Sequence, residues 1–406
     1  MKKNNFKNII QFIFVMCLII NCRTIYVHMI NFNLDNILNI IFIGTVFTYL
    51  FINRHNKISF KRIIVFILIC VYILIYILLC YFIKDEVSFK FVIKFGCILP
   101  ALIMIMFMNK KEDNLEMLDK YSKVMLIISK VSLLFFFLGT VLNIINSTNV
   151  VNIDWGGIRN VESYFMIHFN TQTIPLFSKV LVRNTSIFVE APMFCVNLII
   201  AFVYEMFYRK KMSKKNIIIF TITVITTIST TGIIVVAILY FLKVLLSKKS
   251  VKIIIVPLIL IIGGSTLLLL YKDKMNTNSY RIRKDDINAV EQAIKGNEIL
   301  GIGYMKKSNV EKYMSDFRRY NTGLSSEILI ILLQCGIYIL MLYVLPTILV
   351  LIKSFNKKDY AFLSFSIVQL IFMFTMAFQY TYLALFIIAF DIAYISLEER
   401  KYNNEV

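Results

Sequence analysis

Long apolar runs separated by short polar stretches extend along the whole chain of 406 residues. A helix that crosses a membrane needs about 20 mostly apolar residues. This pattern predicts twelve membrane-spanning segments, of which the seventh is short and would form a re-entrant pair with the eighth, turning at Ser229–Gly232. The predicted spans are residues 8–26, 36–53, 63–83, 91–108, 124–146, 185–207, 216–229, 231–247, 253–271, 325–352, 359–378 and 381–396.

Lysine and arginine gather in every second segment between these spans. With the N-terminus inside, the inner segments hold more than half of the 44 Lys and Arg residues, and the short outer loops hold almost none. Cytoplasmic loops of membrane proteins carry such an excess of positive charge. We therefore expect an all-α, polytopic integral membrane protein with both termini in the cytoplasm, in which residues 1–406 form a single membrane domain.

Composition supports this class. Hydrophobic residues make up 59% of the chain, and its net charge is +20. In a soluble protein that charge would suggest a nucleic-acid partner, but here its position along the chain follows membrane topology, so we expect no nucleic acid.

Two outer segments are too long to be simple connections. Residues 147–184 form the first, and residues 272–324 form the second, which is rich in Lys and Arg. Long loops cross the membrane largely regardless of charge, and large ordered loops usually carry function. We expect the second to be partly helical.

The second loop contains a predicted amphipathic helix from Arg281 to Lys295, with Ser279 as a candidate cap, an apolar face of Ile287, Val290 and Ile294, and Gly296 as a stop. One interpretation is a lipid anchor, with basic residues on anionic headgroups. The other is an arginine cluster over a cavity, which would bind an anionic substrate through the planar guanidinium fork.

Charged residues also mark the entrance of the sixth predicted span. Arg183 precedes Glu190 by seven positions, so on a helix both would face the same side, and Pro192 would bend or open that helix. An ionisable residue in a membrane segment is a functional hypothesis by default. The alternative is a buried structural ion pair. Asp391, in the last span, is more simply explained as a polar contact between packed helices.

Several kinds of site have no signature in the sequence. The seven cysteines lie in or beside apolar segments without zinc or disulfide spacing, and the three histidines lack metal-ligand spacing. There is also no phosphate-binding glycine loop followed by Lys-Ser/Thr. We expect neither a metal nor a cofactor.

Four stretches together resemble the O-antigen ligase and polymerase superfamily, in particular the Wzy-type repeat-unit polymerases. Residues 183–194 (RNTSIFVEAPMF) resemble the signature R-x-x-G/S-x-F-x-E-x-P, and residues 228–232 (ISTTG) resemble a hinge between two short spans. Residues 297–303 (NEILGIG) resemble an N-P-L-x-G-x-G element, and residues 321–337, which end in LQCGI, resemble the return into the membrane. Each motif is weak alone, but their order and spacing are fairly specific.

The chain departs from that pattern in places. Tyr320 stands where ligases have histidine, which argues against a ligase. Ser186 stands where glycine is common, and a strict R-x10-G repeat is absent.

The resemblance implies a metal-independent glycosyltransferase at the outer face of the bacterial cytoplasmic membrane. It would join undecaprenyl-diphosphate-linked oligosaccharides into a capsule, exopolysaccharide or O-antigen. Developing charge on the diphosphate would be stabilised by arginines. Glu190 would orient Arg183 or take a proton from the acceptor; we favour the first, because an ion-paired carboxylate is a poor base. The candidate catalytic residues are Arg183, Glu190, Arg281 and Arg283, and the candidate substrate-binding residues are Arg159, Arg318, Arg319, Tyr320 and Asn321.

Two other functions remain open, a glycan ligase of the same superfamily and a flippase or transporter of lipid-linked sugars. Transporters generally show internal repeats, which this sequence lacks. Besides its substrates and membrane lipid, the candidate partners are a flippase and a chain-length regulator.

Overall fold

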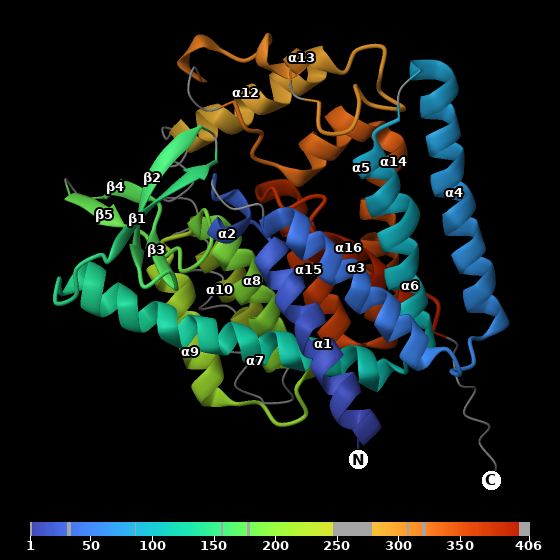
Figure 1. Ribbon diagram of the computed structural model, residues 1–406, viewed down its shortest axis with the longest axis horizontal. Helices are drawn as coiled ribbons and strands as arrows, with labels where there is room; N and C mark the ends of the chain where they lie inside the picture. Colours follow the sequence, from blue (N-terminus) through green and yellow to red (C-terminus); the bar gives the residue numbers. More distant parts are fainter. Residues whose placement is uncertain are drawn as a thin grey trace.

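The computed structural model describes residues 2–30, 34–85, 87–155, 157–176, 179–246, 278–306, 308–318 and 322–397. Within them the chain is mostly helical, and apolar helices form one bundle (Figure 1). The ninth predicted span, 253–271, falls outside the described residues. The predicted site residues Arg319, Tyr320 and Asn321 also fall outside them.

The first half of the chain supplies seven helices and two π-helical continuations. Most of their boundaries lie within a few residues of those of the predicted spans. The exception is α7, which begins at Lys111, well before the start of the fifth predicted span, 124–146, because it also contains the polar residues after Lys111. The elements are α1 (Lys2–Asn21), α2 (Ile25–His28), α3 (Leu34–Asn53), α4 (Phe60–Lys84), α5 (Phe89–Phe91), η1 (Val92–Ile98), α6 (Leu99–Met108), α7 (Lys111–Phe135) and η2 (Phe136–Val141).

The second half continues the bundle after the strands of the first long loop. Its elements are α8 (Ala191–Val203), η3 (Tyr204–Tyr208), α9 (Lys214–Thr226), α10 (Thr230–Leu245), α12 (Asn278–Ala293), α13 (Ser308–Glu311), η4 (Asp316–Arg318), α14 (Glu327–Lys357), α15 (Tyr360–Thr375) and α16 (Tyr382–Ile395). The turn between the short α9 and α10 lies at residues 227–229 and so ends where the predicted turn, Ser229–Gly232, begins. Ser229 caps α10 by accepting a hydrogen bond from the Gly232 amide at 3.4 Å.

Six helical segments are long and apolar enough to cross a membrane. They are Leu34–Asn53, Phe60–Lys84, Phe89–Met108, Lys111–Val141, Ala191–Tyr208 and Glu327–Lys357. Four shorter apolar helices accompany them, at Asn5–Asn21, Thr230–Leu245, Tyr360–Thr375 and Tyr382–Ile395. On α3 and α4 large apolar side chains such as Phe47, Phe51 and Phe82 are exposed, which suits a surface that faces lipid.

The core of the bundle is formed around α8 and α16, whose residues are almost all buried. Within it, Asp391 of α16 accepts hydrogen bonds from Thr347 Oγ1 at 3.0 Å and from Gln369 Nε2 at 3.2 Å. Asp391 is therefore a polar contact among three packed helices, as predicted.

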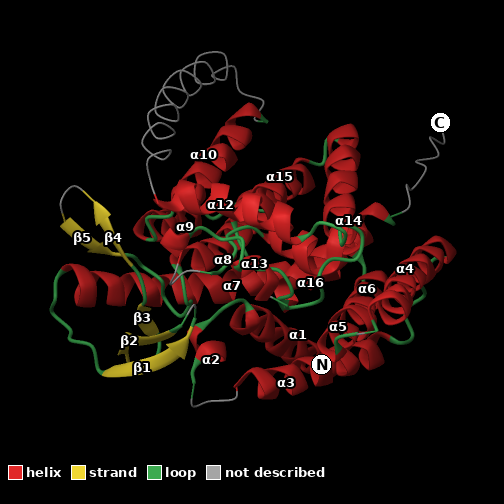
Figure 2. Cartoon of the chain, turned by 90° about the horizontal axis from the view of Figure 1, so that it is seen from above, coloured by secondary structure: helices red, strands yellow, loops and turns green. Residues whose placement is uncertain are grey.

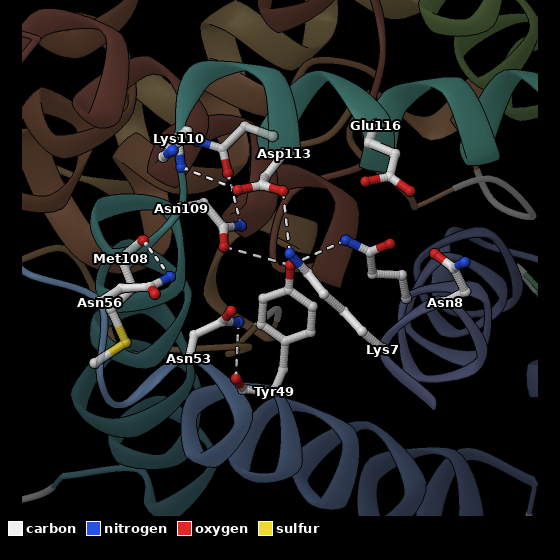
Figure 3. Close-up of polar contacts among 12 residues, drawn as sticks. Lys7, Asn8, Tyr49, Asn53, Asn56, Met108, Asn109, Lys110, Asp113 and Glu116 are labelled. Atoms are coloured by element: carbon white, nitrogen blue, oxygen red, sulfur yellow. Dashed lines mark hydrogen bonds and ion pairs between the residues drawn. The ribbon is translucent and has the colours of Figure 1, made fainter. Parts of the chain in front are cut away.

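One end of the bundle, here called the base end, is closed by a polar network that Figure 3 shows. Lys7 of α1 forms an ion pair with Asp113 of α7 at 3.0 Å, and Tyr49 of α3 donates a hydrogen bond to Asn109 at 3.4 Å. Tyr394, near the end of α16, also belongs to this end, since the ammonium of Lys111 at the start of α7 lies 5.9 Å from the centre of its ring. The start of α1 and the end of α16 thus lie at the same end.

The opposite end, here called the loop end, carries both long segments. There Asn21, after α1, accepts a hydrogen bond from the Tyr382 amide at the start of α16 at 2.8 Å, and the Lys84 ammonium at the end of α4 donates to Asn297 at 3.1 Å. In Figure 1, α12 and α13 cover this end above the bundle.

The first long loop corrects the all-α expectation, because it is made of strands. β1 (Asn149–Asp154), β2 (Ile158–Tyr164) and β3 (His168–Asn170) form an antiparallel sheet, and β4 (Thr173–Leu176) pairs with β5 (Lys179–Val182). Figure 2 shows these strands to one side of the helices. Ile153, Val161 and Phe169 turn inward to a small core of their own, which gives the sheet the alternation typical of strands packed on one face.

The second long loop contains the predicted amphipathic helix, as α12. Val290 and Ile294 of the predicted apolar face are buried, but Ile287 is exposed, so this face was only partly predicted. α12 packs on α13 and on the start of α14, and Gly296 follows it with φ +78°, as predicted for a helix stop.

Candidate functional site

Arg183 lies where three segments of the loop end meet. Its Nε donates a hydrogen bond to the Thr227 carbonyl at 2.8 Å, in the turn after α9, and one of its terminal nitrogens donates to Gln172 Oε1 at 3.2 Å. The same Gln172 oxygen accepts from the Ala191 amide at 3.0 Å. Burial lowers the pKa of Arg183 and Glu190 opposes that change, but a guanidinium stays charged at neutral pH. This side chain therefore joins the first motif stretch to the residue that directly precedes the second.

The prediction that Arg183 and Glu190 share one helix face is wrong. Glu190 has extended backbone, with φ −146° and ψ 148°, and α8 begins only after it. Pro192 lies in the first turn of α8, where its missing N–H costs nothing, so it starts the helix rather than bending it. The physical reason lies in residues 187–189, whose backbone hydrogen-bonds with residues 23–25 and so cannot be helical.

Arg23 is the central side chain of this region, and the predicted site did not include it. Its guanidinium carbon lies 5.2 Å from the ring centre of Trp155, and Trp155 Nε1 donates to Glu190 Oε1 at 2.6 Å. Glu190 and Glu327 both stabilise the charge on Arg23, while burial lowers its pKa. Among the described residues, Arg23 Nε is buried without a hydrogen-bond partner. Arg23, Trp155, Glu190 and Arg183 are called the arginine cluster below.

A signal for Arg23 was present in the sequence. It falls inside the first predicted span, residues 8–26, where an ionisable residue is costly. In the structure α1 ends at Asn21, and Arg23, with a φ of +60°, lies outside that helix. Trp155 lies between Arg23 and Glu190, with its ring against the guanidinium of Arg23 and its indole N–H on Glu190.

The basic loop reaches the neighbourhood of this cluster through Arg283. Arg283 of α12 donates a hydrogen bond to the Thr375 carbonyl at 3.2 Å, and the next residue, Met376, accepts one from the Glu327 amide at 2.7 Å. Glu327 is buried and acts electrostatically on Arg23. Burial lowers the pKa of Arg283, which Asp286 partly offsets. The entrance of α8 and the basic loop are thus linked through Glu327.

The other predicted arginines lie elsewhere. Arg281 is exposed on α12, with its guanidinium carbon 4.9 Å from the ring centre of Phe317. Arg159 is exposed on β2. Neither makes a described contact with the arginine cluster.

Arg318 has a structural environment. It is buried and forms ion pairs with Asp286 at 2.5 Å and Asp285 at 3.4 Å, and it donates to the Gly323 carbonyl at 2.8 Å. A buried ion pair of this kind fixes α12 against the chain that leads into α14, and its removal on one side leaves a buried charge. Its fork is already occupied by carboxylates of its own chain.

The third and fourth motif stretches pair with each other. The Ile302 amide donates to the Leu333 carbonyl at 2.8 Å, and the Gly303 amide donates to the Gln334 carbonyl at 3.0 Å. These contacts lie beside Gly336, where α14 has a non-helical residue with φ +69°. The glycine-containing segment therefore enters the break in α14 and satisfies the backbone groups that the break exposes.

The arginine cluster at the loop end places two guanidinium groups beside a carboxylate. Arg23 and Arg183 supply guanidinium groups, Glu190 is half-buried between them, and Trp155 provides a flat apolar face. Such a set suits an oxyanion joined to an apolar or sugar surface. Within the described ranges, no three His, Cys, Asp or Glu residues are grouped to hold a metal ion.

No protein-family model matches the chain, and no curated protein matches its sequence. The resemblance drawn from the four motif stretches therefore stays a prediction.

Proposed function

We propose that this protein polymerises undecaprenyl-diphosphate-linked oligosaccharide repeat units into a surface polysaccharide, at the outer face of the bacterial cytoplasmic membrane. In this proposal the chain crosses the membrane twelve times, with its base end in the cytoplasm and its loop end outside. The observation that carries the proposal is the arginine cluster, in which side chains from three separate parts of the chain meet at the end that carries both long loops.

The reaction would be a glycosyl transfer without a metal. A hydroxyl oxygen of the acceptor forms a bond to the anomeric carbon of the donor sugar, the bond from that carbon to the lipid diphosphate breaks, and the diphosphate leaves with the electron pair. The acceptor proton is released to the aqueous side. Negative charge grows on the leaving diphosphate, and fixed guanidinium groups stabilise such charge at no cost of reorganisation.

The roles of the individual residues follow from their contacts. Arg23 and Arg183 would hold diphosphate oxygens, with Arg283 approaching from α12. Glu190 would position Arg23 through Trp155, because its Oε1 accepts the indole hydrogen bond at 2.6 Å. Trp155 would hold a sugar ring against its face. Arg281 and Arg159, being exposed, would guide the anionic substrate toward the cluster.

The test replaces Arg23, Arg183 and Arg283 singly by lysine and follows polysaccharide length on a gel. Lysine keeps the charge but loses the planar fork, so we expect each variant to shorten the chains and to lower the rate, by about a hundredfold at Arg23. Arg54→Lys is the matched control, since Arg54 is exposed at the base end, and should leave chain length unchanged. Immunoblots check that every variant reaches the membrane.

Deletion of the gene separates this function from the alternatives. Loss of a polymerase leaves single repeat units on the cell surface, whereas loss of a flippase leaves none outside. Full-length chains in all three lysine variants would contradict the arginine-based mechanism, and absence of single repeats after deletion would contradict a polymerase.

A further inference from the structure

Gln172 lies opposite Arg183 because of the register of the two strands between them. β4 and β5 form an antiparallel pair in which Thr173 lies opposite Val182 (Figure 2). One step beyond that pair, the Arg183 amide donates a hydrogen bond to the Gln172 carbonyl at 2.9 Å. Residues opposite one another in an antiparallel pair carry neighbouring side chains on the same face. The strand register therefore brings the side-chain amide of Gln172 to the guanidinium of Arg183.

The side-chain oxygen of Gln172 is shared between two donors. It accepts a hydrogen bond from one terminal nitrogen of Arg183 at 3.2 Å and another from the Ala191 amide at 3.0 Å. Since both partners can only donate, the oxygen of this amide group must face them, and its two lone pairs allow both bonds at once. Gln172 thus ties Arg183 to the first residue of α8.

A second acceptor holds Arg183 at a different nitrogen. Arg183 Nε donates to the Thr227 carbonyl at 2.8 Å, and Thr227 is fully buried, with its hydroxyl donating to the Val224 carbonyl at 2.6 Å. The next residue, Ile228, has a φ of +49°. A β-branched residue in the left-handed region is strained, and such strain persists only where the surrounding contacts maintain it. The turn after α9 therefore presents the Thr227 carbonyl as a fixed acceptor.

These two acceptors leave one nitrogen of the guanidinium available. The second terminal nitrogen of Arg183 makes no hydrogen bond to any described residue, and it is not fully buried. Because a guanidinium is planar, holding it at two nitrogens also fixes the direction of the third.

We propose that Gln172 is a positioning residue for Arg183. Together with the Thr227 carbonyl it fixes the plane of the guanidinium, so that the free terminal nitrogen meets an oxygen of the lipid diphosphate as negative charge develops there. A donor that is already oriented stabilises such charge without the cost of reorganisation. This role rests on the proposed function, and Gln172 acts in it through Arg183 without touching the substrate.

Gln172 also holds the start of α8, and a purely structural role would act there. The two roles predict different kinetics. Support of the fold alone would matter equally whether residue 183 is arginine or lysine. Orientation of a planar group matters only while that group is present, since a lysine ammonium has no plane to fix.

The test combines Gln172→Ala with Arg183→Lys in a double-mutant cycle. The unchanged protein, both single variants and the double variant are purified at full length and placed in vesicles of phosphatidylethanolamine and phosphatidylglycerol. Their substrate is the undecaprenyl-diphosphate-linked repeat unit extracted from the deletion strain. Since a hydrogen bond to a charged group is lost, Gln172→Ala should lower kcat about tenfold and leave KM nearly unchanged. In the Arg183→Lys background the same change should lower kcat by less than about twofold.

Asn160→Ala, which removes an exposed side-chain amide of β2, is the matched control and should leave kcat unchanged in both backgrounds. Gln172→Met keeps the length of the side chain and removes only its polar group, so it carries the same expectation if Gln172→Ala folds poorly. An equal fall of kcat in both backgrounds, or an unchanged kcat in Gln172→Ala, would overturn the proposal. If the unchanged protein consumes no repeat units, the proposed function fails and this role fails with it. Additive effects in an active protein would remove the role of Gln172 alone.

Discussion

Several polar side chains at the loop end are buried, and one of them is a histidine. His168 of β3 is fully buried and lies near the rings of Phe135 and Tyr164. Burial lowers its pKa to about 4, with a smaller opposing effect from Asn170. The folded protein therefore holds this imidazole neutral, whereas in the unfolded chain it becomes protonated below about pH 6.5.

This burial predicts a loss of stability in mild acid. Since the pKa is lower in the folded state, the neutral form stabilises the fold fully above pH 6.5, and this contribution is lost as the pH falls toward 4. Between pH 7 and pH 5 the loss is about 2 kcal/mol. Thermal unfolding of purified His168→Phe at both pH values should show a smaller difference than the unchanged protein shows. His55→Gln, at an exposed histidine of the base end, is the control; a pH response in His168→Phe equal to that of the control would contradict the prediction.

At the scale of elements, the pairing of residues 298–303 with the break in α14 determines the shape of the loop end. A Cβ atom at Gly336 would lie 2.1 Å from the Ile299 carbonyl oxygen, and one at Gly301 would lie 2.4 Å from the Cys335 amide nitrogen. Both glycines also have positive φ. Backbone approaches of this kind leave no room for a side chain.

We predict that Gly336→Ala separates these two segments. Because backbone atoms on both sides must move and the positive φ is strained, the cost should be at least about 2–4 kcal/mol. Gly44→Ala on α3, where nothing lies within 4 Å of the added Cβ, should be neutral or slightly stabilising. Unfolding temperature and protease cleavage within residues 278–306 measure the effect. Equal stability and cleavage in the two variants would show that the pairing contributes little.

The sequence predicted elements better than it predicted contacts between them. Apolar periodicity located α3, α4, α14, α15 and α16 to within a few residues, because membrane helices satisfy their backbone within one segment. It extended the sixth span to residue 185, since apolar residues 187–189 look helical although their backbone pairs with residues 23–25. Arg23 is held beside residues 187–189 by this pairing and beside β1 by the bridge between Met29 and Ile153, so no local pattern could place Arg23 and Trp155 beside Glu190.

At the scale of the whole molecule, the helices alternate between the two ends. Contacts place the starts of α1 and α7 at the base end, and the starts of α8, α14 and α16 at the loop end. This alternation agrees with the distribution of Lys and Arg along the sequence. The strands of residues 149–182 were not predicted, because short strands in a loop lack a signal as strong as that of a membrane helix.

The proposed orientation predicts on which side of the membrane each end is reached. Asn160→Cys places a thiol on the exposed part of β2, and Lys57→Cys places one in the exposed turn between α3 and α4. A membrane-impermeant maleimide should label Asn160→Cys in intact cells but label Lys57→Cys only after the membrane is permeabilised, because the base end is cytoplasmic in the proposal. The unchanged protein, whose cysteines lie within or beside apolar helices, is the control for background labelling. Labelling of both variants in intact cells would place the two ends on the same side, and labelling of Lys57→Cys alone would invert the topology. The first result would contradict the proposed crossing of the membrane between the two ends, and the second would put the arginine cluster out of reach of substrates at the outer face.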